Sequence, residues 1–251
     1  MIRSTRLRRS FAASIVATGA FGASAAPAAG VISLAPVRPC LSEQDAVSPN
    51  AGGLTPGGAV KFDLASAGRP LLSTASQPAA ADGTYRVAAP YASSVTDRWF
   101  PDQSTATIPL AMTITDLTRL NSGQPATSPE VAATVNLTFS RWTVFISTPG
   151  GRVPTPRTRI RFRAVGWTAD IGRPLYVHYI RARTDLAALR LGVLRGPCGN
   201  LTRTLPRAFP LRGVRAGQYR FLFNASTNPN RRPRLVTRLI RVRKRDAVPA
   251  R

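Results

Sequence analysis

The stretch RTRIRFRAVGW, residues 157–167, alternates charged and apolar side chains. Arginine takes every second position, at Arg157, Arg159, Arg161 and Arg163. The positions between and after them are apolar, at Ile160, Phe162 and Ala164. Successive side chains of a β-strand point to opposite faces of the sheet, so the pattern predicts a strand with one face in the core and an arginine row in solvent. A charge row is most often only a solvated face, and binding of an anion by this row is the alternative.

The first 29 residues have the features of an export signal. A basic start is followed by a weakly apolar segment that ends at Ala25 in an A-x-A motif. The run RRSF at 8–11 resembles the twin-arginine signal, but Ala12 and Ala13 depart from that pattern, so ordinary secretion stays open. We expect a signal peptide at residues 1–29 and a secreted, extracellular protein.

No later window holds eighteen consecutive apolar residues, so we expect no transmembrane segment after processing. About 225 mature residues are enough for one large domain or two ordinary ones.

The charge of the chain is concentrated in its second half. Residues 30–140 hold six basic side chains against eight acidic ones, whereas residues 141–251 hold 25 against three. Their net charges are −2 and +22, within a total of +24. A GC-rich coding bias towards arginine would act on the whole chain, so it does not by itself explain this asymmetry. The asymmetry is the strongest hint of function, and it points to an anionic partner for the second half.

Short alternating segments follow one another along the chain, separated by Gly, Pro and Asp. In the first half these are GGLTPGGAVKFDL (52–64), ADGTYRVAAP (81–90), LAMTITD (110–116) and VAATVNLTF (131–139). In the second half VGWTADIGRPLYVHYI (165–180), RAGQYRFLFNAS (215–226) and LVTRLIRV (235–242) repeat the order of the first, second and last of them. Strands at such spacing predict an all-β sandwich or barrel, with a single short helix around TDLAALRLG (184–192).

The motifs GLTPGGAV (53–60) and ADGTY (81–85), closed by TITD and ATVNLTF, resemble bacterial Ig-like and fibronectin-III-like repeats of secreted proteins. The resemblance covers residues 40–140 and is weaker in the second copy, where Ala169-Asp170-Ile171-Gly172 replaces the Pro-Gly turn. It implies β-sandwich domains in a binding or spacer protein and carries over no catalytic residue. We therefore predict two tandem Ig-like β-sandwich domains, at 30–140 and 141–246, and a disordered tail at 247–251.

The arginines form two candidate clusters for polyanion binding. The first is the row at residues 157–163, and the second lies among the arginines of residues 231–245. If strands at these two places lie in one sheet, the clusters share a face and act together. The candidate binding residues are Arg157, Arg159, Arg161, Arg163, Arg238, Arg241 and Arg243.

Cys40 and Cys198 are the only cysteines, and an exported protein can join them in a disulfide. In an end-to-end tandem, Cys40 would precede the first strand and lie far from the second domain. The bond then requires residues 30–50 to run back along that domain, so pairing and two free buried thiols both stay open.

The residue types needed for catalysis are sparse. His178 is the only histidine, only Asp170, Asp185 and Asp246 are acidic in its half, and no G-x-S-x-G motif supplies a serine. Alternation places His178 opposite the apolar face of LYVHYI, which favours a packed histidine. We expect no enzyme activity.

A metal site or cofactor is equally poorly supported. One histidine and two distant cysteines do not make a zinc site. The aspartates of the first half (Asp82, Asp97, Asp102 and Asp116) lack EF-hand spacing and are typical of solvated turns. We expect no metal and no cofactor.

The composition thus favours a secreted, non-catalytic binding or spacer protein of the bacterial cell surface. An alternative is a polyanion-binding module whose partner is an anionic wall polymer, lipid head groups or nucleic acid. Base stacking is not evident, because the aromatic residues of the second half lie mostly in core positions of strands. A secreted hydrolase that uses His178 is the least favoured alternative, and no protein partner is indicated.

Overall fold

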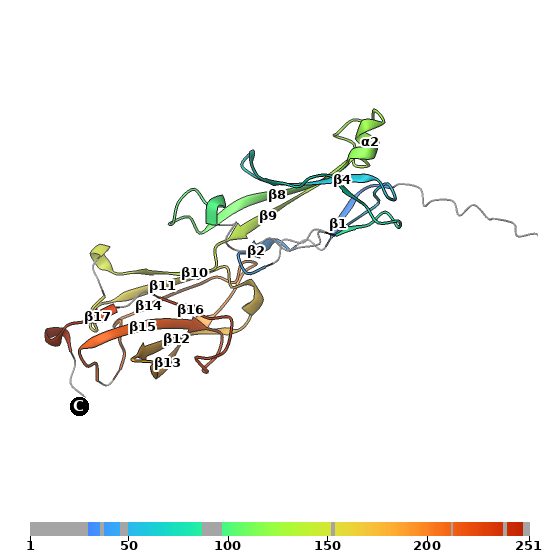
Figure 1. Cartoon of the computed structure of the whole chain (residues 1–251). Helices are drawn as coiled ribbons and strands as arrows, with labels where there is room; N and C mark the ends of the chain where they lie inside the picture. Colours follow the sequence, from blue (N-terminus) through green and yellow to red (C-terminus); the bar gives the residue numbers. More distant parts are fainter. Residues whose placement is uncertain are drawn as a thin grey trace, which may run out of the picture.

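A computed structural model describes residues 30–35, 38–45, 50–86, 97–151, 154–211, 213–237 and 240–247. The expected signal peptide and all of the expected tail except Ala247 lie outside these ranges, as does Arg238. The described chain is all-β, with only short helical turns between strands. The chain forms an N-terminal half and a C-terminal half that lie end to end (Figure 1).

The N-terminal half contains two sheets. A three-stranded sheet has the order β1-β3-β7, and a six-stranded sheet has the order β2-β9-β8-β4-β5 with β6 beside β4. The strands are β1 (Ser33–Ala35), β2 (Cys40–Ser42), β3 (Asn50–Gly52), β4 (Ala59–Ser66), β5 (Arg69–Ser73), β6 (Gln77–Pro78), β7 (Tyr85–Arg86), β8 (Thr107–Asp116) and β9 (Ala132–Ser140). The helical turns are η1 (Asp97–Trp99) and α2 (Leu117–Asn121).

The C-terminal half also contains two sheets. One has the order β10-β11-β14, and the other has the order β13-β12-β15-β16 with β17 also paired to β15. The strands are β10 (Thr143–Ser147), β11 (Ile160–Val165), β12 (Pro174–Arg181), β13 (Thr184–Val193), β14 (Leu201–Leu205), β15 (Gly217–Asn224), β16 (Leu235–Val236) and β17 (Ile240–Val242). The helical turns are η2 (Pro149–Gly151), η3 (Thr168–Asp170) and η4 (Lys244–Asp246).

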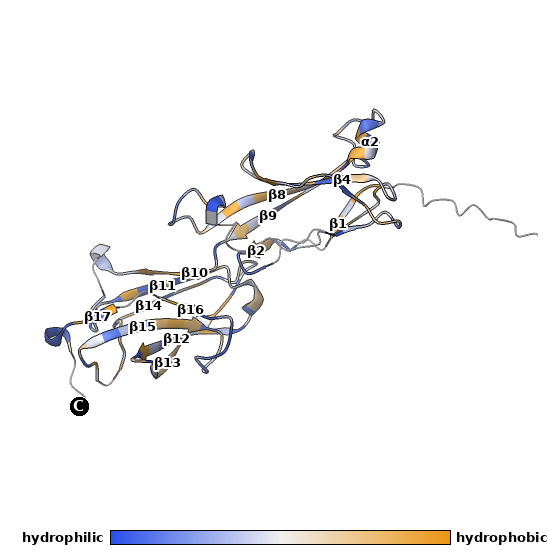
Figure 2. Ribbon diagram, viewed as in Figure 1, coloured by the Kyte–Doolittle hydropathy of each residue, from blue (hydrophilic) through white to orange (hydrophobic). Residues whose placement is uncertain are grey.

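Each half buries its own apolar core between its two sheets. In the N-terminal half, Phe62 of β4 shares a cluster with Tyr85 of β7, which belongs to the facing sheet. In the C-terminal half, the ring of Phe162 on β11 contacts those of Phe221 and Phe223 on β15, with centroids 5.7 and 5.5 Å apart. Hydrophobic residues follow the strands, whereas η4 near the C-terminus is hydrophilic (Figure 2). The two cores divide where β9 ends and β10 begins.

The helix expected around residues 184–192 is wrong, because Thr184–Val193 is the strand β13. Alanine, leucine and arginine favour helices in isolation, but here the segment pairs antiparallel with β12 over its length. The α-helix of the described chain is instead α2. The carboxylate of Asp116 caps it by accepting from the backbone N–H groups of Thr118 and Arg119.

The repeated order of segments does not extend to strand pairing. Sequence order matches β4 to β12, and it matches the segment around Tyr85 (β7) to the segment around Tyr219 (β15). However, β7 lies in the sheet that faces β4, whereas β15 and β12 are paired neighbours in one sheet. Similar turn chemistry precedes both tyrosines, yet turns specify where strands end and not which strands pair.

A buried arginine, Arg119, connects several backbone segments of the N-terminal half. The guanidinium of Arg119 donates to the carbonyl oxygens of Gly30, Gly53 and Glu130 and forms an ion pair with Asp116, whose carboxylate is fully buried. A buried charge is tolerated when it is paired and hydrogen-bonded, so this arginine is structural and is not available to a ligand.

Candidate functional site

The predicted alternation along β11 is present in the structure. Ile160, Phe162 and Ala164 are almost wholly buried, with at most 1% of each residue exposed. Arg161 and Arg163 are exposed on the opposite face. Arg159 and Arg157 lie before the strand, and Arg157 belongs to a turn. Both of these side chains are exposed as well. We call Arg159, Arg161 and Arg163 the arginine face.

The neighbouring strands add hydroxyl groups and one aromatic ring to the arginine face. Phe145 of β10 is paired with Arg163, and Ser147 with Arg161. On the other side of β11, Thr204 is paired with Arg161. The sequences of the three strands, TVFIS, IRFRAV and LTRTL, contain no acidic residue. Over the described ranges, no acidic side chain forms an ion pair with the arginine face. The uncompensated positive charge favours anions at this surface.

The second arginine cluster does not join the first. Arg241 lies on β17, opposite Gln218 of β15, and Arg243 is exposed just beyond the strand. Strand β17 belongs to the sheet that packs against β11 through Phe221 and Phe223, so the exposed side chain of Arg241 faces the opposite side of the C-terminal half. The two strands therefore do not lie in one sheet, and the condition for a shared face is not met. Arg238 lies outside the described residues.

Two open hollows lie along the outer face of β10. The junction hollow has a volume of about 480 Å³ and is lined by Glu43, Gln103, Arg141, Trp142, Thr143 and Phe145. The arginine hollow has a volume of about 340 Å³ and is lined by Ser147, Thr148, Pro149, Arg159, Arg161 and Thr204. Sequence reasoning identified only Arg159 and Arg161 among these residues. The alternation of Thr143, Phe145 and Ser147 in TVFIS was an available signal for β10.

The loop that carries Gln103 is held in place from both sides. The guanidinium of Arg141 donates to the carbonyl oxygens of Asp102 and Thr105, both at 3.0 Å, and lies 4.2 Å from the ring centroid of Phe100. The carboxylate of Asp102 accepts from Ser104 and Thr105, and these hydrogen bonds, led by the Ser104 hydroxyl, lower the pKa of Asp102 to about 2. The wall of the junction hollow is therefore a fixed turn.

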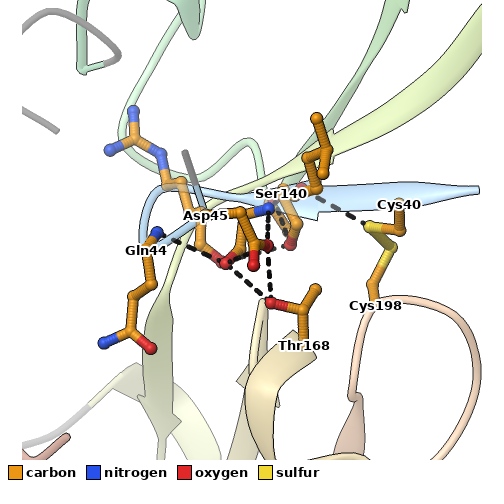
Figure 3. Close-up of a disulfide and its surroundings, with 10 residues drawn as sticks. Cys40, Gln44, Asp45, Ser140, Thr168 and Cys198 are labelled. Carbon is orange, nitrogen blue, oxygen red and sulfur yellow. Dashed lines mark hydrogen bonds between the residues drawn. A yellow bond between two sulfur atoms is a disulfide. The ribbon is translucent and has the colours of Figure 1, made fainter. Parts of the chain in front are cut away.

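A disulfide between Cys40 and Cys198 joins the two halves beside these hollows (Figure 3). The Cα atoms of the two cysteines are 5.2 Å apart. The expectation that Cys40 precedes the first strand far from the second half is wrong. Cys40 begins β2, which pairs in parallel with the end of β9, opposite Thr138. Because β9 leads directly into the C-terminal half, its parallel neighbour lies at the junction.

Hydrogen bonds reinforce this junction on both sides of the disulfide. The Thr168 hydroxyl donates to the carboxylate of Asp45 at 2.7 Å, and the backbone N–H of Ser42 donates to the same oxygen at 2.7 Å (Figure 3). The carboxylate of Glu43 accepts from the backbone N–H of Trp142 at 2.9 Å. The disulfide and these hydrogen bonds together hold the N-terminal half in place beside the two hollows of β10.

Gly166 permits a close approach of two backbone segments at the same junction. Its φ is +75°, and a Cβ there would lie 1.9 Å from the carbonyl oxygen of Arg141. Only glycine fits such a contact, so the turn at the end of β11 depends on this residue.

His178 is fully buried, while Leu175, Val177 and Tyr179 fill the core on the opposite face of β12 as the alternation predicted. Its Nδ1 lies 2.8 Å from the carboxylate of Asp185, and its Nε2 lies 3.0 Å from the carbonyl oxygen of Ser226. Both ring nitrogens are therefore engaged within the protein. The arrangement matches a packed histidine rather than a base open to a substrate.

Among the described residues, no group of three or more His, Cys, Asp or Glu side chains is placed to hold a metal ion. The same part of the chain contains no helix of the length and apolarity needed to cross a membrane.

No protein-family model matches the chain, and no curated protein matches its sequence. Among solved structures, the chain is similar to a red sea bream transglutaminase at 12% identity and a TM-score of 0.29, over 86% of this chain and 32% of that one. It is also similar to a tetra-tandem repeat from the extending region of a large adhesion protein, at 12% identity and a TM-score of 0.27, over 82% of this chain and 46% of that one. The chain thus spans less than half the length of either protein, and similarity at this level assigns it no function.

Proposed function

We propose that the protein is a secreted, non-catalytic binding protein of the bacterial cell surface whose C-terminal half binds an anionic polymer through the arginine face. The observation that carries the proposal is a sheet surface with three exposed arginines and no acidic residue in its strands. The guanidinium group is planar and always charged, and its donors match the geometry of phosphate and carboxylate groups.

Two tandem Ig-like β-sandwich domains, at 30–140 and 141–246, are the architecture that we propose for this function. Two separate cores support it, as does the contact of Tyr219 near the start of β15. Its hydroxyl donates to the carbonyl oxygen of Arg215 at 2.8 Å, four residues upstream. Such a tyrosine corner recurs in Ig-like sandwiches.

Export and the absence of catalysis belong to the same proposal. The pattern of residues 1–29 and the Cys40–Cys198 disulfide favour an oxidising, extracellular location. The burial of His178 disfavours the hydrolase. A spacer role is the second candidate, because the disulfide-linked junction makes the two halves one connected body.

Salt-dependent binding of polyphosphate to the mature chain tests the proposal. Replacing the three arginines of the arginine face with Gln should flatten the plot of log K against log salt by about two units, at about 0.7 per phosphate contact on a single-stranded polymer. The matched control removes the same charge from the opposite sheet, with Arg190→Gln, Arg220→Gln and Arg241→Gln.

The control should retain most of the slope. Equal slopes for the two triple variants would mean that net charge, and not the arginine face, determines binding. Binding that does not depend on salt would refute the proposal and leave the spacer role.

A further inference from the structure

The junction hollow and the arginine hollow adjoin each other along β10. Phe145 lines the first and Ser147 lines the second, and the two residues are i and i+2 on the same strand face. Side chains two positions apart on a strand are separated by about 7 Å. One extended ligand can therefore occupy both hollows.

The two hollows differ in chemistry. The arginine hollow presents two guanidinium groups, from Arg159 and Arg161, and hydroxyl groups from Ser147, Thr148 and Thr204. That combination suits a single carboxylate, phosphate or sulfate group. The junction hollow combines an aromatic ring and an amide, from Phe145 and Gln103, with two opposite charges, from Glu43 and Arg141.

The lining of the junction hollow matches a sugar ring better than a phosphate. The amide of Gln103 both donates and accepts hydrogen bonds, and the hydroxyl groups of a sugar do the same. Glu43 and Arg141 bring opposite charges to the lining, so the junction hollow has no net charge that would attract a phosphate. The half-buried ring of Phe145 offers an apolar surface on which the C–H face of a sugar can pack.

We propose that the two hollows form one binding site for an acidic polysaccharide, with a sugar ring in the junction hollow and its anionic group in the arginine hollow. The inference rests on the proposed function and narrows its ligand to a charged glycan. The site needs both halves, since Glu43 and Gln103 come from the N-terminal half and the arginines from the C-terminal half. The disulfide-linked junction then serves to hold the site together.

Binding of the full mature chain to three probes tests this inference: polygalacturonate, polyphosphate and single-stranded oligo-dT. Gln103→Ala removes an exposed side chain whose loop is held by other residues, and Phe145→Leu removes the ring. Each change should weaken polygalacturonate binding by about three- to tenfold, the range of one lost contact, and should leave polyphosphate binding unchanged. The control Gln44→Ala changes an exposed glutamine next to Glu43 that does not line the hollow, and binding should stay at the wild-type level.

The inference fails if Gln103→Ala and Phe145→Leu both leave polygalacturonate binding unchanged while the arginine-face variant still weakens polyphosphate binding. That result would be consistent with the proposed function but would exclude a glycan as the ligand of the two hollows. Tighter binding of oligo-dT than of polygalacturonate would overturn the inference in favour of nucleic acid. If the arginine-face variant binds every probe like the wild type, the proposed function falls together with the inference.

Discussion

Removal of the Cys40–Cys198 crosslink should destabilise both halves of the protein by several kcal/mol. The cysteines are 158 positions apart, but the chain also crosses between the halves at Arg141. If the N-terminal half unfolds alone, the disulfide and the chain crossing at Arg141 still hold about 100 residues of it as a closed loop. Closing a loop of that length lowers the entropy of the unfolded state by the equivalent of about 4.7 kcal/mol. If the C-terminal half unfolds alone, the tied loop is about 60 residues, and the same relation gives about 4 kcal/mol.

Urea titration of the Cys40→Ala, Cys198→Ala double variant measures this effect. Trp99 lies in the core of the N-terminal half and Trp167 in that of the C-terminal half, so tryptophan fluorescence reports on both. For urea m-values of about 1–3 kcal/mol/M, a loss of about 4 kcal/mol lowers the midpoint by about 1.3–4 M.

Two controls separate the crosslink from other effects. Wild-type protein reduced with a thiol should unfold at the same midpoint as the double variant. Thr168→Val keeps the disulfide and removes the two hydrogen bonds that the Thr168 hydroxyl forms across the junction, with Asp45 and Ser42, so it should cost about 2 kcal/mol. A midpoint for the double variant within about 0.5 M of the oxidised wild type, which is about 1 kcal/mol at these m-values, would refute the loop argument.

Other predictions concern single side chains. Burial raises the pKa of Tyr179, whose hydroxyl has no hydrogen-bond partner among the described residues, so Tyr179→Phe should leave stability unchanged or raise it by about 1 kcal/mol in thermal unfolding. Tyr219→Phe breaks a hydrogen bond to a backbone carbonyl and should cost about 1 kcal/mol, and a stabilising effect would contradict this. Arg119→Leu leaves a buried carboxylate unpaired and should cost about 3–5 kcal/mol in urea unfolding. Gly166→Ala places a Cβ against a carbonyl oxygen and should cost about 2 kcal/mol or more. The pKa of Asp102 is lowered to about 2 in the folded protein, so its contribution to stability is present above 3.8, the ordinary pKa of an aspartate, and is lost as the pH falls through about 2; a carboxyl NMR titration with a midpoint near 3.8 would contradict this.

Period-two patterns predicted the faces of the strands. Ile160 and Phe162 are buried and Arg161 is exposed on the opposite face of β11, because adjacent side chains of a strand must diverge. The same rule placed Val177 and His178 on opposite faces of β12. Side-chain direction within a strand is a local property of the backbone, so the sequence was sufficient to determine it.

Helix propensity gave a wrong prediction for residues 184–192, because strand pairing with another segment of the chain competes with helix formation. Residues 184–192 favour a helix in isolation, yet β13 pairs antiparallel with β12, with two register shifts, and buries part of its surface. The energy of strand pairing depends on a partner elsewhere in the chain, and composition does not reveal that partner.

Sheet assignment and the site were decided by the tertiary structure alone. Arg161 and Arg241 both lie on alternating strands, but their strands belong to facing sheets, so they cannot bind one ligand together. The junction hollow joins Glu43 and Gln103 to Phe145 because β2 pairs in parallel with β9 and brings its end to the start of β10. Residues so distant in sequence meet only when the strand order is set, and that order minimises the free energy of the whole fold rather than of any one segment.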